Sequence, residues 1–142
     1  MRILVPVDGS ASANRAVAHA VMLSEGRDHA EIILLHVQNQ QTLDTSEISG
    51  ITSVGANTER AVAQSEKALR QAIELCRNAH VKFNTRAAYG PIAETIDTTA
   101  REIRADQIVM GTRGFGPLRR AVLGSVSSKV VHLARIPVTL VK

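Results

Sequence analysis

The sequence has few aromatic side chains and no tryptophan. Phe83, Tyr89 and Phe115 are the only aromatic residues among 142. Proteins that bind single-stranded nucleic acid combine basic grooves with aromatic rings on which the bases stack. The net charge of +4 therefore indicates a solvated basic surface, and we do not expect nucleic acid as a partner.

Cysteine is nearly absent as well. Cys76 stands alone, so an intrachain disulfide and a cysteine-rich metal site are both excluded, and a reducing compartment fits. The first apolar run ends at Asp8, too short for the core of a signal peptide, and no stretch reaches the ~20 apolar residues of a membrane span. We expect a cytoplasmic protein without membrane contact.

What the chain does contain is a regular alternation of apolar and amphipathic segments over a length typical of one domain, residues 1–142. Continuous apolar segments predict strands at 2–7, 31–37, 106–110 and 138–141, and a segment with partial alternation of apolar and polar residues predicts another at 81–89. Helical periodicity predicts helices at about 11–25, 58–79 and 118–134, and one more that starts with Pro91 at its first position.

Particular residues support these helices. Ser10 or Ser12 can cap the first helix. In the second helix, a stripe of four residues is expected to face the core: Val62, Leu69, Ile73 and Cys76. On that stripe Cys76 is better explained as a small core residue than as a nucleophile. The polar segment 38–57 has no periodicity, and it could close over a ligand or present a partner surface.

The order of the elements predicts a fold class. Apolar strands that alternate with amphipathic helices form a parallel sheet with helices on both faces, a doubly wound open α/β sandwich. Such a sheet binds its ligand beyond the carboxyl ends of its strands, where the strand order reverses.

A glycine-rich segment follows the fourth predicted strand at once. Gly111, Gly114 and Gly124, with Ser125, form the pattern Gly-x2-Gly-x9-Gly-Ser, which is neither a P-loop nor Gly-x-Gly-x-x-Gly. Glycines let backbone N–H groups approach an anion closely, and the start of a helix adds its positive end. Gly124 inside a helix would cost about 1 kcal/mol, which favours a helix that begins near Gly124 or a close approach there. The pattern predicts a phosphate site.

Hydroxyls and arginines could complete this site. Ser125 and Ser127 would supply hydroxyl groups to phosphate oxygens. Arg113 and the pair Arg119-Arg120 could add positive charge, although for the pair a solvated turn is an equal alternative.

The chain resembles the universal stress protein family, in particular its nucleotide-binding branch. The resemblance spans the whole chain and rests on "ILVPVDGS", "ILLHV", "ADQIVMGTRG", the intact glycine signature and the ending "IPVTLVK". It implies a five-stranded parallel sheet in the order 3-2-1-4-5, of the adenine nucleotide α-hydrolase type. It also implies a homodimer that pairs through the last strand, Val138 to Val141, and ATP with Mg²⁺ as the ligand.

The same resemblance implies roles for individual residues. Adenine would lie near Pro6, Val7 and Val37. The remaining nucleotide contacts would come from Asp8, Met110, Gly111, Arg113, Gly114, Gly124, Ser125, Val126 and Ser127. Asp8 would face the ribose, or Mg²⁺ through the phosphates; its alternative is a turn-former before a helix.

The five histidines do not form a recognisable catalytic or metal pattern. His19, His29, His80 and His132 lack ligand spacing, while His36, at the end of a strand, could either reach the crevice or pack beside it. No nucleophile–base pair is visible. We therefore expect a nucleotide-dependent regulatory protein of the stress response with at most slow ATP hydrolysis. An ATP-hydrolysing enzyme and a nucleotide-free interaction module stay open as alternatives.

Overall fold

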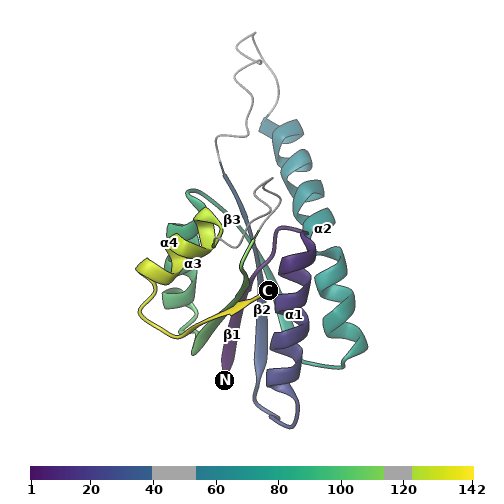
Figure 1. The fold of residues 1–142 in the computed structure, drawn as a ribbon. Helices are drawn as coiled ribbons and strands as arrows, with labels where there is room; N and C mark the ends of the chain where they lie inside the picture. The colour runs from purple at the N-terminus through teal and green to yellow at the C-terminus, as the bar shows by residue number, and fades with distance from the viewer. Residues whose placement is uncertain (40–53, 114–122) are drawn as a thin grey trace.

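The fold is a twisted parallel sheet between two helical layers (Figure 1). The computed structural model describes residues 1–39, 54–113 and 123–142, and of the helical residues 54–58 it describes the backbone only. The elements in these residues are β1 (Arg2–Pro6), α1 (Ala11–Ser24), β2 (Glu31–Gln38), α2 (Val54–Asn78), β3 (Phe83–Tyr89), α3 (Ile92–Glu102), β4 (Gln107–Gly111), α4 (Ser125–Leu133) and β5 (Val138–Val141). Every strand pair is parallel and the strand order is β3-β2-β1-β4-β5, which confirms the predicted architecture.

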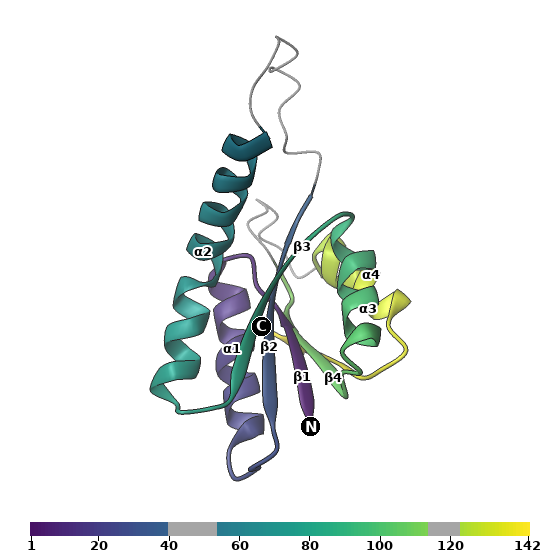
Figure 2. The same cartoon turned by 180° about the vertical axis from the view of Figure 1, so that it is seen from behind.

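The helices divide between the two faces of the sheet. Helices α1 and α2 cover one face, and α3 and α4 cover the other (Figures 1 and 2). Successive residues of a strand point to opposite faces, so β1 and β2 contribute to two separate cores. Ile3 and Val5 pack beneath α1 and α2, whereas Leu4 packs beneath α3 and α4.

The apolar content of each strand follows its place in the sheet. The central strands β1, β2 and β4 are mostly buried, as their continuous apolar runs predict. The edge strand β3 exposes most of its residues, which explains its mixed composition. The other edge strand, β5, is half-buried throughout.

The first helix begins as expected. Ser10 is its N-cap, and the Ser10 hydroxyl oxygen accepts a hydrogen bond from the Ala13 N–H at 3.1 Å. Before α3, Pro91 is the N-cap residue, whereas the prediction made it the first helical residue. The helix therefore begins one residue later than predicted, at Ile92. The Pro91 carbonyl accepts the first helical bond, from Thr95 N–H at 2.9 Å, and a cap needs no N–H of its own.

The second helix begins at Val54, four residues before the predicted start. Leu69 and Cys76 are buried as predicted, but Val62 is 52% exposed, and its assignment to the core stripe is wrong. The Gln38 side chain at the end of β2 donates to the Ala61 carbonyl oxygen, so Val62 lies level with the point where the sheet ends. No apolar surface of β2 reaches beyond this level to cover Val62.

The predicted helix at 118–134 is too long at its amino end. Leu123 and Gly124 are not helical, Gly124 is the N-cap, and α4 starts at Ser125. The alternative that the helix begins near Gly124 is therefore correct, and Gly124 escapes the interior-helix penalty. Arg119 and Arg120 lie outside the described residues. In the described residues no helix is both long and apolar enough to cross a membrane.

Candidate functional site

A cavity of about 440 Å³ opens at the carboxyl ends of β1 and β4. The chain winds from β1 to β3 in one direction and from β4 to β5 in the other, so this is the point at which the strand order reverses. We call it the switch-point cavity. It is lined by Pro6, Val7, Asp8, Ala13, Leu35, Val37, Ile92, Ile96, Met110, Gly111, Arg113, Leu123, Gly124, Ser125, Val126 and Ser127.

One part of the cavity is apolar. Leu35 and Val37 project into it from β2, Ile92 and Ile96 from α3, and Met110 from β4. The same faces of these elements form the core beneath α3 and α4, so the cavity continues that core past the end of the sheet. A flat apolar group would be desolvated here as it would be in a protein interior.

The other part of the cavity is the start of α4. The first helical bond joins Ser128 N–H to the Gly124 carbonyl oxygen at 2.9 Å, so the N–H groups of Ser125, Val126 and Ser127 have no partner within the helix. All three of these residues line the cavity. Unpaired N–H groups together with the helix dipole favour a negatively charged group at this position.

Gly124 and Ser127 hold the turn before α4 against the end of β4. Gly124 N–H donates to the Thr112 carbonyl oxygen at 2.8 Å, and a Cβ on Gly124 would lie 3.2 Å from that same oxygen. The Ser127 side chain is buried, and its hydroxyl group lies within hydrogen-bond distance of the carbonyl oxygens of Thr112, at 3.1 Å, and Gly124, at 3.0 Å. Because a hydroxyl has one hydrogen to donate, the Ser127 side chain is used in holding this turn.

Asp8 lies at the start of the β1–α1 turn. One carboxylate oxygen accepts a hydrogen bond from Ser10 N–H at 2.9 Å, which is the turn-forming role given to Asp8 as its alternative. Asp8 is also one of the residues that line the cavity. The two roles are therefore compatible.

Gly111 has a structural role that the phosphate interpretation did not include. A Cβ at this position would lie 2.4 Å from the Ser12 hydroxyl oxygen and 2.8 Å from the Ser12 carbonyl carbon. Helix α1 therefore packs against the end of β4 so closely that only glycine fits. The Ser12 hydroxyl is buried there without a hydrogen-bond partner among the described residues.

Comparison with known proteins assigns this architecture to a family. The Universal stress protein family matches residues 1–142. The chain belongs to this family. It is 33% identical to the universal stress protein YxiE of Bacillus subtilis over 99% of this chain and 98% of that protein.

Solved structures agree with the family assignment. UspA from Lactobacillus plantarum is 26% identical, covers 100% of this chain and 97% of its own, and superposes with a TM-score of 0.77. A family member from Arabidopsis thaliana, solved with AMP bound, is 22% identical, covers 100% and 91% of the two chains and has a TM-score of 0.71. At that identity, the second likeness establishes the fold alone.

In this universal stress protein, every residue predicted for nucleotide contact lines the switch-point cavity except Gly114, which lies outside the described residues. The prediction missed five lining residues: Ala13, Leu35, Ile92, Ile96 and Leu123. Ile96 is buried in the core beneath α3 and α4, and the half-buried Ile92 packs against that core, so both lie on the sheet-facing side of α3. The sequence could have indicated Ile92 and Ile96 as lining residues, because both lie in the first turns of a helix that starts at the carboxyl edge of the sheet.

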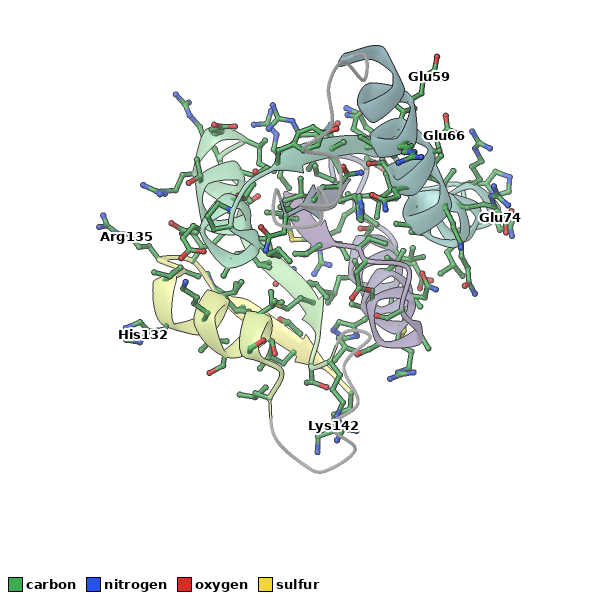
Figure 3. The ribbon with its side chains drawn as sticks, turned by 90° about the horizontal axis from the view of Figure 1, so that it is seen from above. Glu59, Glu66, Glu74, His132, Arg135 and Lys142 are labelled. Atoms are coloured by element: carbon green, nitrogen blue, oxygen red, sulfur yellow. The ribbon has the colours of Figure 1, made fainter. Side chains whose placement is uncertain are left out.

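The histidines stay outside the cavity. His36 lies beside it, and its ring Nδ1 is 2.9 Å from the Val7 carbonyl oxygen, so of its two alternatives the packed position is correct. His132 points away from the sheet on the outer side of α4 (Figure 3). In the part of the chain that the structure describes, no three His, Cys, Asp or Glu side chains gather into a metal site.

Proposed function

We propose that this universal stress protein binds ATP in the switch-point cavity and acts in the cytoplasm as a regulatory protein of the stress response, controlled by its nucleotide. The observation that carries the proposal is the pairing of an apolar chamber with three N–H groups of α4 that have no partner within the helix, in one cavity. Its volume of about 440 Å³ suits a small molecule. Residues 1–142 would act as one domain.

The apolar part would hold the base. The Leu35 carbonyl accepts a hydrogen bond from Val7 N–H at 2.7 Å, so the peptide groups of Leu35 face β1. Two residues later the strand has the same orientation, and the N–H and C=O of Val37 face the space beyond Pro6, where β1 ends. An adenine edge carries an amino donor next to a ring nitrogen acceptor, which complements this N–H and C=O pair.

The start of α4 would hold the phosphates. Ser125, Val126 and Ser127 would donate their backbone N–H groups, and Gly124 lets the anion approach the backbone. Ser125 would add its hydroxyl, whereas Ser127, whose hydroxyl is used in the turn, would contribute its N–H alone. Arg113, Met110, Gly111 and Gly114 are proposed along the ribose and the first phosphate.

Mg²⁺ would be held between Asp8 and the phosphates. Asp8 is the one carboxylate among the described residues that line the cavity. Mg²⁺ is commonly bound by one or two carboxylates, substrate phosphates and water, so the residues fit the ion only together with a nucleotide. The ion would neutralise phosphate charge, and Asp8 would position it.

The same cavity favours binding over catalysis. No second acid or base among the described residues lines it beside Asp8, and general acid–base catalysis needs a group within hydrogen-bond reach of the reacting proton. Slow hydrolysis is the most that we propose.

A homodimer would pair β5 with β5 of a second copy. Val138–Val141 forms one edge of the sheet, and its residues are half-buried within the single chain. Unpaired N–H and C=O groups on an apolar edge strand favour pairing with another strand.

The test places a negative charge in the phosphate site. Ser125→Asp and Ser128→Asp each add one carboxylate to the first turn of α4, where it favours the helix, but only Ser125 lines the cavity. We expect calorimetric titration with Mg-ATP to show about tenfold or greater loss of affinity in Ser125→Asp and less than about threefold change in Ser128→Asp. Equal affinities in the two variants would refute the phosphate site. Nucleotide released from denatured fresh protein, identified by mass, would show which nucleotide is bound.

A further inference from the structure

The hydrogen-bond ladder between β1 and β2 ends in an unusual way. Val7 N–H donates to the Leu35 carbonyl oxygen at 2.7 Å. A parallel ladder that continued would next join Val37 N–H to the Val7 carbonyl oxygen. In this structure the His36 ring takes that carbonyl, with Nδ1 at 2.9 Å from the oxygen.

His36 makes this contact from the face of the sheet opposite the base chamber. Along β2, Leu35 and Val37 face the cavity side, while Ile32 and Leu34 face α1 and α2. By the alternation of a strand, His36 shares the face of Ile32 and Leu34. The ring therefore lies outside the cavity and can influence a bound base only through the backbone.

The direction of the hydrogen bond is fixed by its partner. A carbonyl oxygen only accepts, so the ring must carry a proton on Nδ1. Both the Nδ1–H neutral form and the imidazolium ion satisfy this requirement.

We propose that His36 is a positioning residue for base recognition. By donating to the Val7 carbonyl oxygen, it ends the ladder and keeps Val37 N–H directed to the cavity, where it can donate to a ring nitrogen of the base. This inference deepens the proposed function and rests on it for the identity of the ligand. Without the ring donor, Val37 N–H would turn to Val7 and the base would lose its donor.

The variants separate the donor from the volume of the ring. His36→Phe keeps an aromatic ring and removes the donor, and His36→Leu is a second donor-free side chain if the first does not fold. His36→Asn carries an amide nitrogen at nearly the position of Nδ1 and should restore the bond. His29→Phe is the matched control, because His29 is an exposed histidine that precedes the amino end of β2, whereas the cavity opens at the carboxyl ends of the strands.

The first measurement compares ATP with inorganic tripolyphosphate by calorimetry. We expect His36→Phe to weaken ATP binding about tenfold and to leave tripolyphosphate binding within about twofold, because only the base end changes. His36→Asn should lie within about threefold of the original protein for both. Equal loss of both ligands in His36→Phe would indicate a general structural role and overturn the proposal.

The second measurement needs no nucleotide. In the ligand-free protein, the Val37 amide should exchange its hydrogen with solvent at least about fivefold more slowly in His36→Phe than in the original protein, because it gains the Val7 carbonyl. Unchanged exchange overturns the inference whether or not ATP binds. If the original protein binds no adenine nucleotide, the proposed function fails, and slower exchange would still establish the part of His36 in ending the ladder.

Discussion

The contact between Gly111 and Ser12 makes a sharp stability prediction. A Cβ on Gly111 would meet the Ser12 hydroxyl oxygen at 2.4 Å and the Ser12 carbonyl carbon at 2.8 Å. The second atom is backbone, so α1 as a whole must move away from β4. Forcing an extra carbon into a packed site costs typically 1–3 kcal/mol, and with a backbone clash we expect Gly111→Ala to lower the free energy of unfolding by about 3 kcal/mol.

Ser12→Ala provides the internal check. The Ser12 hydroxyl has no partner among the described residues, so its removal alone should change stability by less than about 0.5 kcal/mol. In the Gly111→Ala background it removes the shortest contact and leaves the 2.8 Å one, and it should recover about 1 kcal/mol. Gly26→Ala is the control: a Cβ there meets nothing, and the left-handed backbone at φ +69° alone should cost about 1 kcal/mol.

Urea unfolding of the nucleotide-free variants, followed by circular dichroism, measures these differences. Gly111→Ala should also lower the thermal midpoint by about 10 °C at this chain length. If Gly111→Ala unfolds within 0.5 kcal/mol of the original protein, or if Ser12→Ala does not improve it, α1 does not pack against β4 as closely as described.

Two further predictions concern α2. Burial raises the pKa of the Cys76 thiol from 9.0 to about 11; the native thiol should resist alkylation at pH 8 until urea unfolds the chain. Because the pKa of the thiol is higher in the folded state, the stability that this thiol contributes is complete below pH 9.0 and is lost as the pH rises through about 11. The difference in unfolding free energy between the original protein and Cys76→Ala should therefore change across that window. Leu69→Ala should lower the unfolding free energy by about 2–5 kcal/mol and Val62→Ala by less than about 0.5 kcal/mol, since Leu69 is 5% exposed and Val62 is 52% exposed; similar losses would contradict the end of the buried stripe.

Local pattern was enough to predict the fold and much of the candidate site. The apolar runs of β1, β2 and β4 could be read as buried parallel strands because helices cover both of their faces. The position of Gly111, directly after such a strand, predicted that the glycine-rich segment begins at the carboxyl edge of the sheet.

Other features depend on contacts that no single segment contains. Val62 has the right helical spacing for the core, and only the length of β2 shows that no sheet lies beneath it. Gly111 was interpreted as a phosphate contact, but its packing against Ser12 becomes visible only when α1 is placed against β4. The start of α4 depends on Gly124 bonding back to Thr112, an interaction between the residue that precedes α4 and the residue that follows β4.

The cavity itself follows from where the hydrogen bonds of the central strand stop. Val7 N–H points to β2, so the nitrogen of the preceding residue, Pro6, faces β4. Proline has no N–H to donate, and the paired register between β1 and β4 ends two residues earlier, at Leu4 and Ile108. On the other side, the His36 ring bonds to the carbonyl of Val7, the residue that follows β1. One proline and one histidine thus release the central strand from both neighbours at the same level, and the space that opens there is the one in which we place the nucleotide.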